Sequence, residues 1–151
     1  MRLVAWIADW LGSTGVTPRS GGHALEGYLA LGRRPGFGGT LESRTVLLAA
    51  ALAADLSGCR WCIDRAHHDW RKAGLPAHLL GQLRAYAGSR WFTSRERAAL
   101  ALVEAVACAR ASPSEIDHAR EVLTDNELAE LTVIVAEHHC LETIDSNLPA
   151  P

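Results

Sequence analysis

RTVLLAAALAADLSGCRWCIDRAHHDWRKAGL, residues 44–75, carries the clearest helix signals in this sequence. An apolar run leads to Gly58, and a C-x-x-C pair and a mainly polar segment follow it up to Gly74 and a nearby proline. Glycine is common just past the end of a helix, and proline cannot continue one. The pattern therefore predicts one helix over about residues 41–57 and a second over about residues 59–73.

Helix signals also dominate the rest of the chain. Three later segments begin with Ser or Thr followed three residues on by Glu. This is the capping box, in which the Ser or Thr oxygen accepts from the backbone N–H of the Glu, and the Glu side chain accepts from the backbone N–H of the Ser or Thr. Further helices are predicted over about residues 2–11, 22–32, 76–87, 94–110, 113–122 and 125–146. No alternating strand pattern of convincing length occurs. We therefore expect an all-α fold in a single domain spanning residues 1–151.

Composition excludes several classes of protein. The chain has 151 residues, of which 48% are hydrophobic and 21% are charged, as in an ordinary soluble domain. Its formal net charge of −2 and the absence of a Lys/Arg-rich run argue against a nucleic-acid partner. The longest apolar run, residues 46–54, is too short to cross a bilayer, and no signal peptide is convincing. We expect a cytoplasmic protein with no membrane partner.

Two predicted helices are apolar on nearly all sides, over residues 46–56 and 98–109. A helix without a polar face is buried inside a domain or between subunits. Because the chain is short, we expect neighbouring subunits to cover part of both helices. In the last predicted helix, a stripe is expected to pack in the core: Ala129, Val133, Ala136, Cys140 and Ile144.

The C-x-x-C pair indicates redox chemistry. Gly58 places Cys59 at the start of a helix, where free N–H groups and the helix dipole favour a thiolate over a thiol. Cys62 follows one turn later on the same face and can close a disulfide with Cys59. Arg60 adds a nearby positive charge. The thiolate is the nucleophile toward both peroxides and disulfides, so the pattern predicts a dithiol/disulfide site.

Helical spacing also suggests which residues surround the thiols. The cysteines share an inward stripe with Ile63, Ala66, Trp70 and Ala73. His67 flanks this stripe and His68 lies on the polar face, so His67 is the better candidate for carrying protons. Glu104 is the only charge in residues 98–109 and is a further candidate, because a buried carboxylate would have a raised pKa. An ion pair with an arginine is the favoured alternative for Glu104.

Two other interpretations of the cysteines stay open. Cys59 and Cys62 could be buried residues without chemistry, since cysteine packs like a small hydrophobe. They could also bind a metal together with His67 or His68, with His138, His139 and Cys140 as further donors. Structural zinc usually gathers ligands from loops or from two C-x-x-C-like units, and this chain has one. We therefore expect neither a metal nor another cofactor.

Both halves of the chain resemble the carboxymuconolactone decarboxylase/alkylhydroperoxidase D (AhpD) family. The similarity rests on residues 44–75 and on two later segments, FTSRERAALALVEAVACA at residues 92–109 and LTDNELAELTVIVAEHH at residues 123–139. It implies an AhpD-like bundle of about six to eight mostly antiparallel helices that assembles as a homotrimer or homohexamer. It further implies a thiol peroxidase or disulfide oxidoreductase that reduces hydroperoxides and is itself reduced by an external dithiol. By position, Cys62 would attack the peroxide and Cys59 would close the disulfide.

The chain departs from the family pattern at two positions. Peroxidases of the family carry a His four residues after the second cysteine and a Glu twelve residues before the first. These positions are Ala66 and Leu47 here. Either the proton relay is rebuilt from other residues, with His67, His68 and Glu104 as candidates, or the protein is not a peroxidase. In the second case we expect a ligand-binding or redox-sensing protein of the same fold with a structural disulfide.

Overall fold

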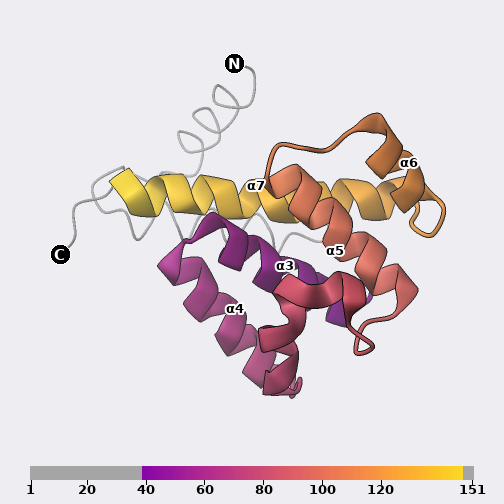
Figure 1. Ribbon diagram of the computed structural model, residues 1–151. Helices are drawn as coiled ribbons and strands as arrows, with labels where there is room; N and C mark the ends of the chain where they lie inside the picture. The colour runs from indigo at the N-terminus through magenta and orange to yellow at the C-terminus, as the bar shows by residue number, and fades with distance from the viewer. Residues whose placement is uncertain (1–38, 148–151) are drawn as a thin grey trace. The chain divides into compact units, whose positions relative to one another are not determined.

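A computed structural model describes residues 39–147 of the chain, with side chains described up to Thr143. The helices in this part are α3 (Ser43–Ser57), α4 (Arg60–Lys72), the 3₁₀ helix η1 (Ala77–Gly88), α5 (Ser94–Ala107), α6 (Pro113–Arg120) and α7 (Asp125–Asn147) (Figure 1). No strand occurs between residues 39 and 147, so the predicted all-α fold is confirmed. The helices predicted over 2–11 and 22–32 lie outside the described residues, and the single domain over 1–151 remains a prediction.

Two glycines set the ends of the first helix pair, as the sequence predicted. Gly58 has a φ of 71°, and its N–H donates to the carbonyl oxygen of Ala54 over 3.1 Å, which ends α3. Gly74 has a φ of 69° just beyond the end of α4. Only glycine adopts this left-handed conformation without strain. The turn at Gly58 fixes the start of α4, and therefore fixes where the cysteine pair lies.

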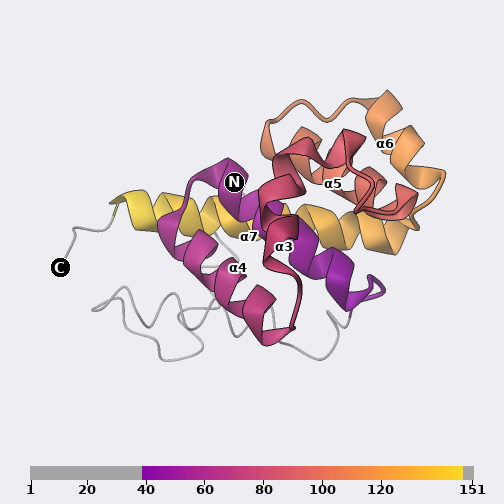
Figure 2. The ribbon, with the colours of Figure 1, turned by 60° about the horizontal axis from the view of Figure 1, so that its bottom comes forward.

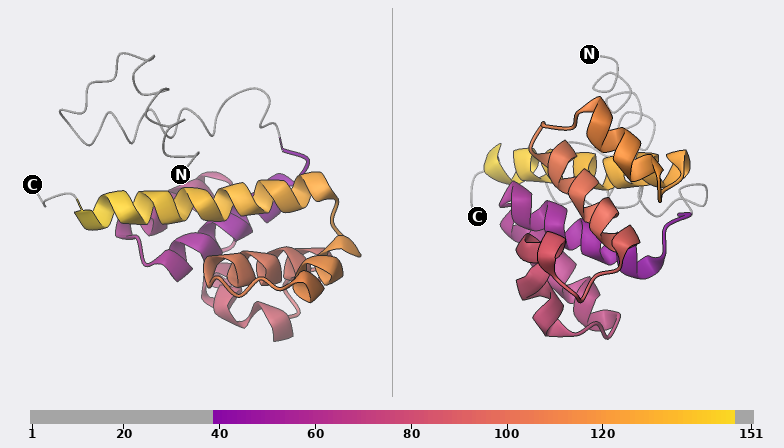
Figure 3. Two further views of the ribbon diagram at one scale, coloured as in Figure 1. Left: turned by 90° about the horizontal axis from the view of Figure 1, so that it is seen from above. Right: turned by 45° about the vertical axis from the view of Figure 1, so that its right-hand side comes forward.

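The helices α3, α5 and α7 begin at the same end of the bundle. Arg44 Nε of α3 donates to Glu96 Oε1 of α5 over 2.7 Å, and Arg95 of α5 pairs with Glu127 in the first turn of α7. Figures 1 and 3 show the three helices running in the same general direction. The resemblance implied mostly antiparallel helices. These three helices are instead roughly parallel. After α3, the chain returns through α4 and η1 to the end where α5 begins. After α5, it returns through the segment that contains α6 to the end where α7 begins.

The core lies around α3, which packs against α4, α5 and α7. Leu48, Leu52 and a run of alanines fill its buried sides, so most of this apolar helix is covered by its own chain. α5 is less fully covered. It lies toward the edge of the bundle with the short helix α6 beside it (Figure 2), and its Ala101 is exposed. Coverage by neighbouring subunits remains a prediction. In the part of the chain that the structure describes, no helix is long and apolar enough to cross a membrane.

The core-facing stripe predicted for α7 is wrong. Val133 is 47% exposed, Ala129 and Ala136 are also exposed, and Cys140 is half-buried; the side chain of Ile144 lies outside the described part. The buried side instead carries Leu128, Leu131, Ile134, Val135, His138 and Leu141. Because both sides of the helix are rich in apolar residues, the sequence period does not identify the inner one. Contacts do: Glu127 pairs with Arg95, and Glu130 Oε2 accepts from the backbone N–H of Leu41 over 3.2 Å.

Candidate redox site

Cys59 and Cys62 form a disulfide across the first turn of α4, with a Cα–Cα distance of 5.2 Å. Cys59 is the N-cap residue of α4, and its Sγ accepts a hydrogen bond of 3.2 Å from the backbone N–H of Cys62. Both residues are only 2% exposed. The predicted disulfide is therefore present, and it lies at the N-terminus of a helix inside the fold.

The charges around the pair favour a negative sulfur at the helix start. No acidic residue occupies the first turn of α4, and Arg60 immediately follows Cys59. Free N–H groups at a helix N-terminus carry a partial positive charge that stabilises an anion. Burial acts in the opposite direction, because a low-dielectric environment disfavours the charged form. The arrangement can support a dithiol/disulfide cycle in which a thiolate is the nucleophile.

The inward side of α4 agrees in part with the predicted stripe. Cys62, Ala66 and Trp70 are buried, whereas Ile63 is half-buried and Ala73 is exposed. Trp70 Nε1 donates to the carbonyl oxygen of Pro76 over 3.2 Å, which ties α4 to the segment that follows it. The thiols therefore share their side of the helix with apolar groups.

The structure does not bring the two predicted histidines to this side of the helix. His67 and His68 are both exposed, although Cys62 and Ala66 on the same helix are buried. One residue along a helix corresponds to a rotation of about 100°, so His67 points away from the direction of Ala66. Both imidazoles therefore lie on the solvent-exposed side of α4, whereas the thiols lie on its buried side.

Glu104 is not the buried carboxylate that the sequence suggested. Its side chain is 39% exposed and lies 3.7 Å from Arg110, so the predicted ion pair with an arginine is confirmed. Its Oε2 also accepts from the hydroxyl of Tyr86 over 2.7 Å. Burial, and then the hydrogen bond to Glu104, raise the pKa of Tyr86 well above its ordinary value. These contacts give Glu104 a role in joining η1 to α5.

A buried histidine lies on α7 at a position that the sequence suggested only as a possible metal donor. Among the described histidines, His138 alone is buried, and its Nδ1–H donates to the carbonyl oxygen of Ile134 over 2.7 Å. In the neutral ring, Nε2 then carries the lone pair. Burial lowers the pKa of His138. Because apolar residues lie on both sides of α7, the sequence does not show that His138 is on the buried side.

Glu137, the neighbour of His138, was not predicted as a site residue. Burial raises the pKa of Glu137, and the positive charge of Arg65 on α4 acts in the opposite direction. α7 packs against both α3 and α4. A base and a carboxylate with shifted pKa values therefore lie on a helix that contacts the cysteine-bearing helix.

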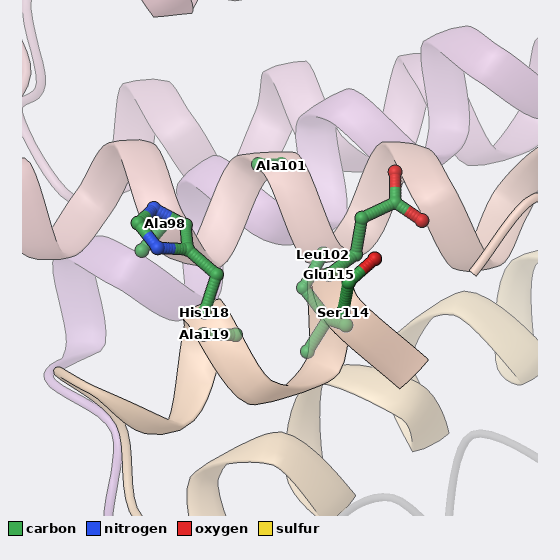
Figure 4. Close-up of a pocket in the computed structure, with 7 residues that line it drawn as sticks. All are labelled: Ala98, Ala101, Leu102, Ser114, Glu115, His118 and Ala119. Carbon is green, nitrogen blue, oxygen red and sulfur yellow. The ribbon is translucent and has the colours of Figure 1, made fainter. Parts of the chain in front are cut away.

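The described residues contain a pocket that neither redox cysteine lines, and no cluster of metal ligands. Between residues 39 and 143, no three His, Cys, Asp or Glu side chains gather as they would to hold a metal ion. A shallow pocket of about 270 Å³ lies between α5 and α6, where His118 and Ser114 face Ala98, Ala101 and Leu102 (Figure 4). Its lining includes no residue of α4 and thus neither redox cysteine.

No protein-family model and no curated protein matches the chain by sequence. By structure, the chain is similar to a protein of unknown function from Agrobacterium tumefaciens that has been suggested to be the antioxidant defence protein AhpD. The two are 25% identical with a TM-score of 0.64, and the match covers 85% of this chain and 88% of that chain. The chain therefore has an AhpD-like all-α fold.

Proposed function

We propose that this protein is an AhpD-like thiol peroxidase and disulfide oxidoreductase that reduces organic hydroperoxides through Cys59 and Cys62. The observation that carries the proposal is the disulfide across the first turn of α4, with one sulfur accepting a backbone N–H. The antioxidant role suggested for the structurally similar A. tumefaciens protein is consistent with it. No bound organic cofactor is needed, because the dithiol supplies both electrons.

The proposed cycle has three steps. A thiolate of the reduced pair attacks the peroxide, the O–O bond breaks, and the alkoxide takes up a proton and leaves as the alcohol, so that a sulfenic acid remains. The second thiol attacks the sulfenic sulfur, forms the disulfide and releases water. An external dithiol then returns two electrons and two protons by thiol–disulfide exchange. One hydroperoxide is reduced for each disulfide formed.

Proton transfer in this cycle requires an acid/base group near the pair. His138 meets this requirement better than His67, His68 or Glu104, because it is buried on a helix that packs against α3 and α4. Its Nε2 is available to accept a proton, since Nδ1 is committed to Ile134. His138 of α7 would therefore carry the proton in place of the family histidine, whose position is Ala66 in this chain.

Steady-state turnover tests the proposal. Reduced protein is assayed with cumene hydroperoxide and dithiothreitol as the recycling dithiol, and Cys59→Ser and Cys62→Ser are compared with Cys108→Ser. Cys108 is an exposed free thiol, so its replacement controls for thiol content. We expect turnover in the wild type and in Cys108→Ser, and loss of turnover in the variant that lacks the attacking thiol, because dithiothreitol can reduce a sulfenic acid where the second cysteine is missing. Turnover that survives in Cys59→Ser and Cys62→Ser would contradict the proposal.

The proton carrier is tested in the same assay. His138→Gln should lower the rate by about 100-fold near neutral pH, the lower end of what general acid–base catalysis contributes. It should also remove an acidic limb from the pH–rate profile, which a purely structural change would not do. His67→Ala and His68→Ala should keep most of the rate. A large loss of turnover in His67→Ala, with an unchanged rate in His138→Gln, would show that His67 on α4 is the proton carrier.

A second candidate function is redox sensing or ligand binding with a mainly structural disulfide. Two observations favour it: Leu47 and Ala66 stand where the family peroxidases carry acid/base groups, and both redox cysteines are only 2% exposed. Its signature would be a disulfide that forms and is reduced normally in a protein that does not turn over hydroperoxide.

We also propose that the protein is cytoplasmic and assembles as a homotrimer or homohexamer, without nucleic-acid or membrane partners. The exposed apolar residues of α7, among them Val133, supply a surface on which subunits could pack. Light scattering tests the assembly. A monomeric mass at micromolar concentration would contradict it.

A further inference from the structure

We infer that Cys59, rather than Cys62, is the attacking thiol of the pair. The inference rests on the proposed dithiol chemistry and concerns which sulfur carries the negative charge in the reduced protein. The resemblance to the AhpD family assigns attack to the second cysteine, Cys62. The hydrogen bonding of this site favours the first.

The two sulfurs differ in what stabilises a charge on them. Cys59 Sγ occupies the N-cap position of α4 and accepts the backbone N–H of Cys62 over 3.2 Å. An N–H donor binds a thiolate more strongly than a thiol, because the charge assists the hydrogen bond. Within the described part of the chain, no group donates a hydrogen bond to the Cys62 sulfur. The local donor therefore favours ionisation of Cys59.

Burial does not offset this difference. Cys59 and Cys62 are each 2% exposed, so the cost of removing a charge from water is similar for the two thiols. The helix dipole is felt most strongly at the N-terminus of the helix, where Cys59 is the N-cap residue. The first turn of α4 holds no acidic residue that would oppose a thiolate there. With burial equal, the N–H donor and the helix terminus decide which thiol ionises first.

The first step of the cycle can then be assigned to atoms. The Cys59 thiolate attacks the peroxide oxygen and becomes a sulfenic acid, while the alkoxide leaves and is protonated to the alcohol. The Cys62 thiol attacks the Cys59 sulfur, and its proton leaves with the hydroxyl group as water. The electrons come from the two thiols, and the product is the disulfide seen in the structure.

Competitive alkylation tests the assignment in the wild-type protein. Trypsin cleaves after Arg60, so the two cysteines fall on separate peptides, residues 45–60 and residues 61–65. Reduced protein is labelled with limiting iodoacetamide at several pH values, digested, and quantified by mass spectrometry. We expect the peptide of residues 45–60 to be labelled roughly tenfold faster near pH 6.5, with a lower midpoint in its pH profile. Faster labelling of residues 61–65, or equal labelling, would overturn the inference.

Trapping with peroxide gives an independent readout. In Cys62→Ser, one equivalent of hydroperoxide should leave a sulfenic acid on Cys59 that dimedone captures, whereas Cys59→Ser should give little adduct on Cys62. Serine keeps an oxygen acceptor at the N-cap, so the Cys59→Ser helix start is preserved. Capture mainly on Cys62 with normal wild-type turnover would overturn the inference and leave the peroxidase proposal standing. Faster labelling of Cys59 in a protein without turnover would support the inference and contradict the peroxidase proposal.

Discussion

The positive charge of Arg65 on α4 acts on the partly buried carboxylate of Glu137 on α7. Arg65 lies one turn past Cys62, and Glu137 directly precedes the buried His138. The interaction therefore relates the helix that carries the redox pair to the helix that carries the proposed proton acceptor. Since successive residues of a helix are rotated by about 100°, His138 lies on the adjoining, core-facing side of α7.

Replacing Glu137 by Gln should stabilise the fold at alkaline pH. Burial raises the pKa of Glu137 and Arg65 opposes the shift, so the folded state prefers the protonated carboxyl. A raised carboxyl pKa means that this contribution is present at low pH and is lost as the pH rises through the folded-state value. Urea unfolding of Glu137→Gln should show a gain near pH 8 that vanishes near pH 4. A loss of stability near pH 8 would show that the Arg65 contact outweighs burial.

His138 should make the fold sensitive to mild acid. Burial lowers the pKa of His138, with the charge of His139 acting in the same direction and the bond to Ile134 opposing it. As the pH falls, the His138 imidazole is therefore protonated in the unfolded chain before it is protonated in the folded state. Stability should fall below about pH 6.5, by at most about 1.4 kcal/mol per pH unit for one proton. His138→Gln should flatten this dependence, while the exposed neighbour variant His139→Gln should keep it. An unchanged profile in His138→Gln would exclude His138 as its source.

Gly58→Ala and Gly74→Ala form a matched pair. Both glycines have a left-handed φ, and an added β-carbon would meet nothing within 4 Å at either position, so backbone strain is the shared cost. Each should lower the free energy of unfolding by about 1 kcal/mol. Because Gly58 alone precedes the N-cap cysteine, only Gly58→Ala should also slow alkylation of Cys59 near neutral pH. Equal effects of both variants on Cys59 would mean that general destabilisation is the cause.

The capping glutamate of α7 should matter more than that of α6. Glu127 binds the N–H of Thr124 over 2.8 Å, pairs with Arg95 and is buried, whereas Glu115 makes the same cap on the exposed α6. Glu127→Ala should cost about 1–2 kcal/mol by thermal or urea unfolding, and Glu115→Ala should cost less. The backbone bond to Thr124 is the first cause of the lowered pKa of Glu127, so its stabilisation should be lost as the pH falls below the ordinary carboxyl value. Equal losses in the two variants would show that the tie between α5 and α7 contributes little.

The helices could be predicted from sequence because their ends are encoded locally. Gly58 and Gly74 stop two helices, and the capping boxes at Thr93 and Ser112 start two more. The position of the disulfide followed from the same local signals. The direction of the helices did not follow from local signals, because it depends on how the segments containing η1 and α6 lead the chain back to the end where α5 and α7 begin.

The surroundings of the site depended on tertiary contacts and were predicted less well. The buried side of α7 is not encoded by a contrast between apolar and polar faces, so the burial of His138 and of Glu137 was not predicted. Glu104 lies in an apolar run, but Tyr86 and Arg110 reach it from outside that run. The local sequence gives no sign that these two partners are near.

A single-turnover experiment tests whether the Cys59–Cys62 pair reduces hydroperoxides, and it does not depend on the identity of the reducing partner. Fully reduced protein is mixed with one equivalent of an organic hydroperoxide, and the alcohol formed and the disulfide between residues 45–60 and 61–65 are both quantified. We expect one alcohol per Cys59–Cys62 disulfide within seconds, and no alcohol from Cys59→Ser. Reduced thiols that persist while hydroperoxide remains unconsumed, in a protein whose disulfide forms readily with a disulfide oxidant, would contradict the peroxidase proposal.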